Sequence, residues 1–250
     1  MPDSPTWRER QYVMNRVLFW DFHGTLIYPD KLWSKSIYRV IQDLWPDRPL
    51  TLQQVSACQE KGAFPWDHPE RDYRHLTNPE DWWNYMSNMF VRTCLRCGLS
   101  DDEARRVAPQ VRDRILEPVN FRLYEDAEWT LEQLSAQGWR HIMLSNNFPE
   151  LESICRALGI GRHFEAFVVS ALVGYDKPRI EIFDLARGRA GFPDRCVMIG
   201  DNPVADIVGA RLAGMQSVLV HREDETAEHI CARLSDLVPL LSQGRFHLPM

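Results

Sequence analysis

Short apolar runs alternate with helix-like segments along the second half of the chain. Each run is short, continuous and bounded by turn residues, which is typical of a strand buried on both faces of a sheet. The segments between them have helical spacing, and several begin with proline or are followed by glycine. This alternation predicts an α/β fold: a doubly wound, mainly parallel, Rossmann-like sheet with helices on both faces. The expected strands are residues 141–144, 164–170, 196–200 and 217–220, and the expected helices are residues 126–137, 149–158, 178–189 and 203–213.

A further apolar run lies near the N-terminus and predicts a strand at residues 16–21. The run leads directly into Asp21, and a turn at Gly24 and Thr25 follows. Such a strand delivers a carboxylate to its carboxyl end, where open α/β sheets place their chemistry. Thr25 offers a hydroxyl and an amide to a ligand there. Residues 1–12 are expected to be a tail or a short lead-in.

Between these two regions the pattern changes to helical spacing with few β-branched runs. Two helix starts are expected, because Asn78 stands before Pro79 and Ser100 stands three residues before Glu103. We therefore interpret this stretch as a helical insert in the α/β core. The predicted division is residues 13–28 and 122–250 for the core and residues 29–121 for the insert, with helices near residues 31–44, 51–61, 79–97 and 100–116.

Composition and charge exclude several classes of protein. A net charge of −6 over 250 residues argues against a nucleic-acid-binding or anionic-membrane-binding surface. No run approaches the roughly 18–20 apolar residues that span a bilayer. The first 16 residues lack the apolar segment of a signal peptide. We expect a cytoplasmic protein.

The six cysteines do not form the pattern of a disulfide-rich protein. Cys94 and Cys97 have the CxxC spacing, but the chain has no second such pair to complete a zinc site. Their surroundings have helical spacing, so we expect two ordinary helix cysteines.

Three of the predicted strands end in polar residues, which are Asp21, Ser145 and Asp201. A parallel sheet places the carboxyl ends of these strands at one edge. Lys177 and Asp206 each stand near the start of a predicted helix. Each residue also has a structural alternative: the serine as an N-cap, the lysine as a solvated residue, the aspartates at the positive end of a helix. Their joint arrangement favours an active site.

These segments resemble the four ordered motifs of the haloacid dehalogenase superfamily, and specifically its phosphatase-like branch with a helical cap after the first motif. The resemblance covers nearly the whole chain. It implies that the helical insert is a cap over the core. The matching segments are Asp21-Phe22-His23-Gly24-Thr25-Leu26, Ser145-Asn146, Lys177-Pro178 and Gly200-Asp201 with Asp206.

The resemblance implies a phosphohydrolase (phosphatase) that acts on a small phosphorylated metabolite. Asp21 would attack phosphorus and form an aspartyl-phosphate. Lys177 would keep Asp21 ionised and offset charge on the phosphoryl oxygens. Ser145 and Asn146 would hydrogen-bond those oxygens.

The resemblance also implies a bound Mg²⁺, which prefers a few carboxylate ligands. Asp21 and Asp201 would bind the metal directly and His23 through its backbone carbonyl, and Asp206 would support the metal site from behind these ligands or through water. His23 departs from the family pattern, which has a second aspartate as the acid and base at this position. An imidazole is competent for proton transfer, but a nearby Mg²⁺ favours its neutral form and thus a base over an acid. We expect slow or pH-shifted hydrolysis, or hydrolysis of substrates with good leaving groups.

The insert contains one loop-like segment, residues 64–71, in which prolines bracket an aromatic residue, an imidazole and charges. We expect it to form part of a lid that closes over the site and excludes water, although a plain ordered loop has the same composition. The residues expected to meet the substrate are Trp66, His68, Arg71 and Arg74. They predict that the substrate is a small anionic phosphate ester. The oligomeric state of the protein is left open.

Two other functions remain open on the same core. A dehalogenase or another carbon-directed hydrolase would not need the metal, whereas the presence of both Asp201 and Asp206 favours phosphoryl chemistry. The histidine at position 23 favours a non-catalytic binding module that has lost turnover. The presence of every other motif residue argues against such a module.

Overall fold

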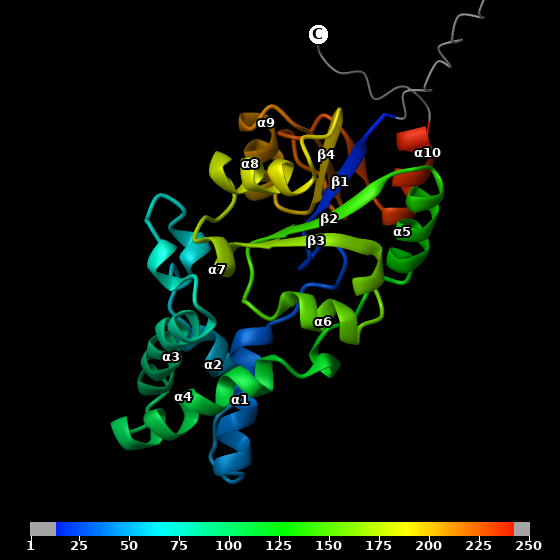
Figure 1. The fold of residues 1–250 in the computed structure, drawn as a ribbon. Coiled ribbons are helices and arrows are strands. Elements are labelled where there is room, and N and C mark those ends of the chain that lie inside the picture. The colour runs from blue at the N-terminus through cyan, green and yellow to red at the C-terminus, as the bar shows by residue number, and fades with distance from the viewer. Residues whose placement is uncertain (1–13, 243–250) are drawn as a thin grey trace, which may run out of the picture.

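A computed structural model describes residues 14–242 of the chain. Within this part, one sheet and the helices that cover it form an α/β fold (Figure 1). The predicted lead-in at residues 1–12 lies outside the described residues, as do residue 13 and residues 243–250 at the predicted ends of the core.

The sheet has six parallel strands in the order β3-β2-β1-β4-β5-β6. The first described strand, β1, lies in the middle of the sheet, and later strands are added on both sides of it. The predicted doubly wound α/β fold is therefore confirmed. The order reverses between β1 and β4, and the carboxyl ends of strands at such a point form a crevice for ligands. The strands are β1 (Arg16–Trp20), β2 (Arg140–Ser145), β3 (Phe164–Val169), β4 (Arg195–Gly200), β5 (Gln216–Val220) and β6 (Ile230–Cys231).

Alternate residues of β1 pack into two separate hydrophobic clusters, as the two-residue period of a strand requires. Leu18 and Trp20 belong to the larger cluster, whereas Val17 and Phe19 belong to the smaller one. Figure 1 shows α5 and α10 on one side of the sheet and α8 and α9 on the other. Burial on both faces explains why the strands have continuous apolar sequences. The helices of this region are α5 (Ala127–Ala136), α6 (Leu151–Ala157), α7 (Ser170–Val173), α8 (Ile180–Arg189), α9 (Gly209–Leu212) and α10 (Leu237–Ser242).

The predicted insert contains helices and no strand, and Figure 1 shows its four α-helices grouped beyond one end of the sheet. Both predicted helix starts are confirmed. The Asn78 side chain accepts a hydrogen bond from the Glu80 amide, and Ser100 and Glu103 form a capping box. The helices are α1 (Leu32–Leu44), α2 (Leu52–Cys58), α3 (Pro79–Arg96) and α4 (Asp101–Ile115), with short 3₁₀ turns at Pro65–Asp67, Arg74–Leu76 and Pro118–Asn120.

The segment expected to be one helix over residues 203–213 differs from the prediction. It begins as a π-helix at Pro203–Val208 and continues as α9. The Asn202 side chain accepts hydrogen bonds from the amides of Val204 and Ala205 and fixes this start. π-Helical turns are frequent at functional sites, and this one contains Asp206.

All six cysteines are free. Cys94 is buried in α3 and Cys97 caps its C-terminus, in agreement with two ordinary helix cysteines. Among the described residues, none of the helices combines the length and the apolar character that a membrane span requires.

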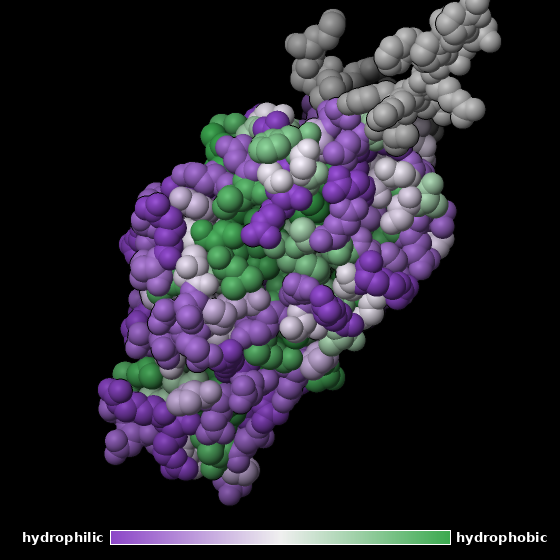
Figure 2. All heavy atoms as spheres, in the orientation of Figure 1, coloured by the Kyte–Doolittle hydropathy of each residue, from purple (hydrophilic) through white to green (hydrophobic). Residues whose placement is uncertain are grey.

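Figure 2 shows a mainly hydrophilic face with apolar atoms gathered over the region of α7, α8 and β3. The exposed apolar side chains of α7, α8 and the turn after α8 are Leu172, Ile180, Leu185 and Phe192. The largest apolar area in this view therefore belongs to the α/β core.

The buried His141 of β2 makes the stability of the core depend on pH. The Trp20 indole donates to His141 Nδ1 at 2.9 Å, and Nε2 lies 3.0 Å from Ser135 Oγ. Burial, and to a smaller degree His163, lowers the pKa of His141 from 6.5 to about 4. Between these two values the unfolded chain binds more protons than the folded one, so the free energy of unfolding falls as the pH falls.

We expect His141 to remove about 2 kcal/mol of stability at about pH 5 relative to about pH 7.5. Urea unfolding of the wild type and of His141→Gln at both pH values checks this, because the variant should lose that part of the pH dependence. His75→Gln replaces an exposed histidine and should keep it. A His141→Gln variant with the wild-type pH dependence would contradict the expectation.

Candidate active site

The carboxyl ends of β1, β2 and β4 bring the predicted site residues together. Asp21 follows β1, Ser145 ends β2 and Asp201 follows β4. The Lys177 ammonium donates to Asp21 Oδ1 at 2.8 Å and to Asp206 Oδ1 at 2.6 Å. It donates a third hydrogen bond to the Leu144 carbonyl at 2.8 Å. All three ammonium protons are therefore used inside the protein, where Lys177 is only 2% exposed.

The charges of Lys177 and the three neighbouring aspartates do not balance. Burial opposes the charged form of Lys177, but Asp206 and Asp21 raise its pKa above the ordinary value. Burial, together with repulsion from Asp21 and Asp206, raises the pKa of Asp201 to about 7. Burial also raises the pKa of Asp206, although Lys177 opposes that shift. One lysine thus faces three carboxylates in a buried pocket, and a further cation there would relieve their repulsion.

The three carboxylates each offer an oxygen atom within 4.8 Å of the others. Asp206 is committed to the protein, because Oδ1 accepts from Lys177 and Oδ2 accepts from the Asn202 amide at 3.0 Å. Asp21 Oδ1 accepts from Lys177 and from the Ser145 hydroxyl, the latter at 2.9 Å. Its Oδ2 has no hydrogen-bond partner in the described part of the chain, so one oxygen of Asp21 is left for a ligand.

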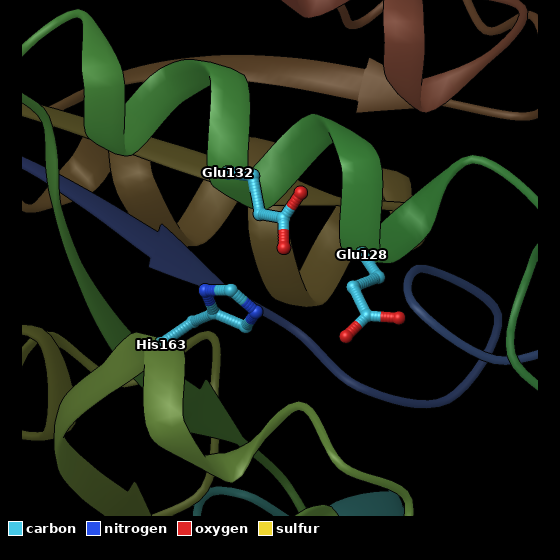
Figure 3. A group of neighbouring side chains, drawn as sticks. All are labelled: Glu128, Glu132 and His163. Carbon is cyan, nitrogen blue, oxygen red and sulfur yellow. The ribbon is translucent and has the colours of Figure 1, made fainter.

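A second group of possible metal ligands lies on the surface and consists of Glu128, Glu132 and His163 (Figure 3). The Arg162 guanidinium already pairs with both glutamates, at 2.7 Å and 3.4 Å. This positive charge distinguishes the group from the buried aspartates, whose negative charge is only partly balanced.

Two glycines allow the carboxylates to come this close. A Cβ atom on Gly24 would lie 2.4 Å from Asp201 Oδ2, and Gly24 has a φ of +79°, which favours glycine. A Cβ atom on Gly200 would lie 2.1 Å from Asp206 Oδ2. Both distances are far below van der Waals contact, so glycine is required at each position by the approach of a carboxylate.

The turn after β2 supports the site through two asparagines. The Asn146 side chain donates to the Lys177 carbonyl at 2.9 Å and accepts from its amide at 2.7 Å, which fixes the backbone of the lysine. Asn147 was missed by the sequence analysis as a site residue. Its Nδ2 lies 3.0 Å from His23 Nδ1, and its Oδ1 accepts from the Phe148 amide. Its position next to the Ser145-Asn146 motif was the available indication.

The imidazole ring of His23 is neutral near pH 7. Burial lowers its pKa to about 4 against the opposing charge of Asp21. Because Asn147 Oδ1 is an acceptor for Phe148, Asn147 Nδ2 is the donor to His23 Nδ1. The ring proton is then on Nε2. Phe121 and Phe148 lie edge-on to the imidazole, at 6.1 Å and 6.4 Å between ring centres.

Thr25 is fully buried, and its hydroxyl donates to Asp201 Oδ1 at 3.3 Å. The hydroxyl thus bonds a site carboxylate in this structure, and its contact with a ligand stays a prediction. His221, which directly follows β5, contacts this turn. The sequence analysis did not predict it as a site residue. Its Nε2 is 2.9 Å from the Thr25 carbonyl, and its ring stacks on Tyr124 at 3.8 Å. The left-handed φ of 65° at His221 is uncommon for a non-glycine residue, and it directs the ring to the Thr25 turn.

A cavity of about 260 Å³ opens beside these residues. Trp66 lines it, as expected from the sequence, but His68, Arg71 and Arg74 are not among its lining residues. The lining residues are His23, Gly24, Pro29, Asp30, Leu32, Trp33, Trp66, Asn146, Asn147 and Asp201.

The three other insert residues that were predicted to contact the substrate face their own loop or the solvent. His68 Nε2 lies 3.1 Å from the Gly62 carbonyl. Arg71 has a 60% exposed side chain, and Arg74 pairs with Asp72 at 2.6 Å. These three side chains are therefore not in position to contact a ligand held in this cavity as the structure has it, and their contact with substrate stays a prediction.

Comparison with known proteins agrees with this geometry. A model of haloacid dehalogenase-like hydrolases matches residues 16–214. The haloacid dehalogenase-like hydrolase domain-containing protein 3 of Mus musculus is 28% identical over 94% of this chain and 97% of its own. Phosphoserine phosphatase of Thermus thermophilus is 33% identical over 55% of each chain. The magnesium-bound HAD-hydrolase YfnB of Bacillus subtilis has a TM-score of 0.68 at 19% identity, over 92% of this chain and 100% of that one.

We expect Lys177→Met to lower the free energy of unfolding by about 3–5 kcal/mol, because it leaves buried carboxylates without their cation. Lys35→Met is the matched control, since it removes a lysine from the surface pair with Asp30 and should cost less than about 1 kcal/mol. Urea unfolding of both variants near neutral pH measures the difference. Equal losses in the two variants would contradict the role given to Lys177.

Proposed function

Since this chain belongs to the haloacid dehalogenase-like hydrolases, we propose that it is a phosphatase that acts on small phosphate monoesters through Asp21. The observation that carries this proposal is the pairing of one buried lysine with two of three clustered aspartates. This arrangement places a buried cation beside a carboxylate at the point where a phosphoryl group would bind. The name of the phosphoserine phosphatase relative supports the same class of reaction.

In the proposed reaction, a carboxylate oxygen of Asp21 attacks phosphorus and the bond to the leaving oxygen breaks. A carboxylate is a weak nucleophile, so it must be aligned and kept charged. The hydrogen bonds that Oδ1 accepts from Lys177 and Ser145 do both. The aspartyl-phosphate would then be hydrolysed by water, which regenerates Asp21.

The buried carboxylates fit a divalent cation. Asp21 and Asp201 are oxygen ligands of the kind that Mg²⁺ prefers, and the raised pKa of Asp201 reflects an excess of negative charge. Asp206 would act mainly by orienting Lys177 and the turn at Asn202, and the His23 carbonyl would complete the protein's ligands. Bound Mg²⁺ supplies charge neutralisation for the phosphoryl oxygens and the attacking carboxylate.

His23 is proposed to donate a hydrogen bond rather than a proton. Its Nδ1 is occupied by Asn147, and the remaining Nε2–H of a neutral imidazole is a poor acid. The ring can orient a leaving oxygen or a water molecule, but it cannot protonate a basic alkoxide well. Substrates with good leaving groups, or water as the proton source, are therefore favoured.

We also propose that residues 29–121 form a cap over the core of residues 13–28 and 122–250. The cavity supports this division. Its walls come from Pro29, Asp30, Leu32, Trp33 and Trp66 on one side and from the strand ends of the core on the other. A movement of the insert would open and close the cavity.

We expect phosphate release from acetyl phosphate and from simple alkyl phosphates to require Mg²⁺ and Asp21. Asp21→Asn keeps the shape of the side chain and removes its charge, and it should lower turnover by at least about 100-fold. Phosphate release with Mg²⁺ and with a chelator, for the wild type and Asp21→Asn, measures both effects. Release that persists in Asp21→Asn would exclude this nucleophile, and halide release without phosphate release would favour a dehalogenase.

We expect His23→Asp to raise kcat for alkyl phosphates by about 10-fold or more, because a carboxyl group at this position can protonate a poor leaving group. The rate for acetyl phosphate, whose leaving group needs little protonation, should change less. Comparison of kcat for the two substrates in the wild type and His23→Asp tests this. His75→Asp places the same charge at an exposed histidine outside the site and serves as the control. An equal change for both substrates would contradict the proposed role of His23.

A further inference from the structure

The wall of the active-site cavity that belongs to the insert is aromatic. Trp33 and Trp66 line it, and Phe64 stacks on Trp66 at 4.8 Å with an angle of 7° between the ring planes. Trp33 lies 5.0 Å from Phe64 and 6.0 Å from Trp66 between ring centres. These mutual contacts fix the orientation of the Trp66 ring. On this side the cavity thus presents flat aromatic rings held in place by their own contacts, beside Pro29, Asp30 and Leu32.

The same cavity offers no cation for a second acidic group of the substrate. Among the described residues that line it, none is a lysine or an arginine. Two of them, Asp30 and Asp201, are acidic. Lys35 does not line the cavity, and its ammonium is paired with Asp30 at 2.7 Å. Lys177 lies deeper and is fully engaged by Asp21, Asp206 and a carbonyl. A carboxylate on the leaving group would find no cation among the described residues of the cavity lining and would face an aromatic wall.

From these two features we infer that the preferred substrate is the phosphate monoester of an uncharged alcohol that carries a flat aromatic or heteroaromatic ring. The ring stacks against the Trp66 wall, and the phosphoryl group reaches Asp21 past His23 and Asp201. This inference rests on the proposed phosphatase function. It narrows the small anionic phosphate ester that the sequence predicted to one whose alcohol is uncharged, because the arginines expected to contact the substrate do not line the cavity.

The first test compares benzyl phosphate, ethyl phosphate and phosphoglycolate. All three are esters of primary alcohols, so their leaving groups differ mainly in the part that the cavity would contact. We expect kcat/KM for benzyl phosphate to exceed the values for the other two by at least about 10-fold, which is the scale of one good aromatic contact. A higher kcat/KM for phosphoglycolate, or equal values for all three, would overturn the inference.

The second test assigns the preference to Trp66. Trp66→Leu should lower the benzyl-to-ethyl ratio of kcat/KM by about 10-fold, and Trp66→Phe, which keeps a flat ring, should restore most of it. Trp129→Leu removes a half-exposed tryptophan on α5 and should leave the ratio unchanged. A ratio that is the same in Trp66→Leu and Trp129→Leu would overturn the assignment.

Binding separates this inference from the proposed function. Calorimetry on Asp21→Asn with Mg²⁺ should give a Kd for benzyl phosphate at least about 10-fold below that for phosphoglycolate. Acetyl phosphate has no ring, so its hydrolysis by the wild type reports the phosphatase function alone. Hydrolysis of acetyl phosphate without a preference for benzyl phosphate refutes only the inference. A binding preference without any hydrolysis refutes the function and keeps the ring-binding site.

Discussion

The active site depends on one buried ion-pair network centred on Lys177. The lysine ammonium joins the strand-end aspartate of β1 to Asp206 in the π-helical turn after β4, and it also bonds the Leu144 carbonyl of β2. Burial of such charges is costly unless every hydrogen-bonding position is used. Here all three ammonium protons are used, so the network fixes the relative positions of three separate elements. The same contacts align the Asp21 carboxylate and place a positive charge beside it.

Steric limits at two glycines make this network possible. Gly24 and Gly200 each stand where any Cβ atom would overlap a site carboxylate. The positive φ of Gly24 also turns the chain back so that the Thr25 hydroxyl can reach Asp201. His221 supports that turn from β5 through a hydrogen bond to the Thr25 carbonyl. The short sequence motifs therefore reflect the close packing of the site as well as its chemistry.

The insert and the core contribute side chains of different character to the cavity. The core contributes the carboxylate of Asp201, whereas the insert contributes Trp33 and Trp66 but no arginine. The Asp30 carboxylate at the cavity wall is paired with Lys35, which leaves no net positive charge there. Charge at the strand ends and aromatic rings in the wall thus come from different parts of the chain. His23 lies where the two parts meet, since it lines the cavity two residues after Asp21.

The sequence by itself determined most of the alternation of strands and helices, because continuous apolar runs and helix caps are local patterns, but it did not predict α7, β6 or α10. It also determined which edge of the sheet holds Asp21, Ser145 and Asp201, because parallel strands share their carboxyl edge. Only the tertiary structure decided the bond between Asn147 and His23, which joins residues 124 positions apart. It also decided the wall of the cavity. Side chains of an irregular loop follow no periodic face, so their directions depend on contacts with distant residues that no local pattern contains.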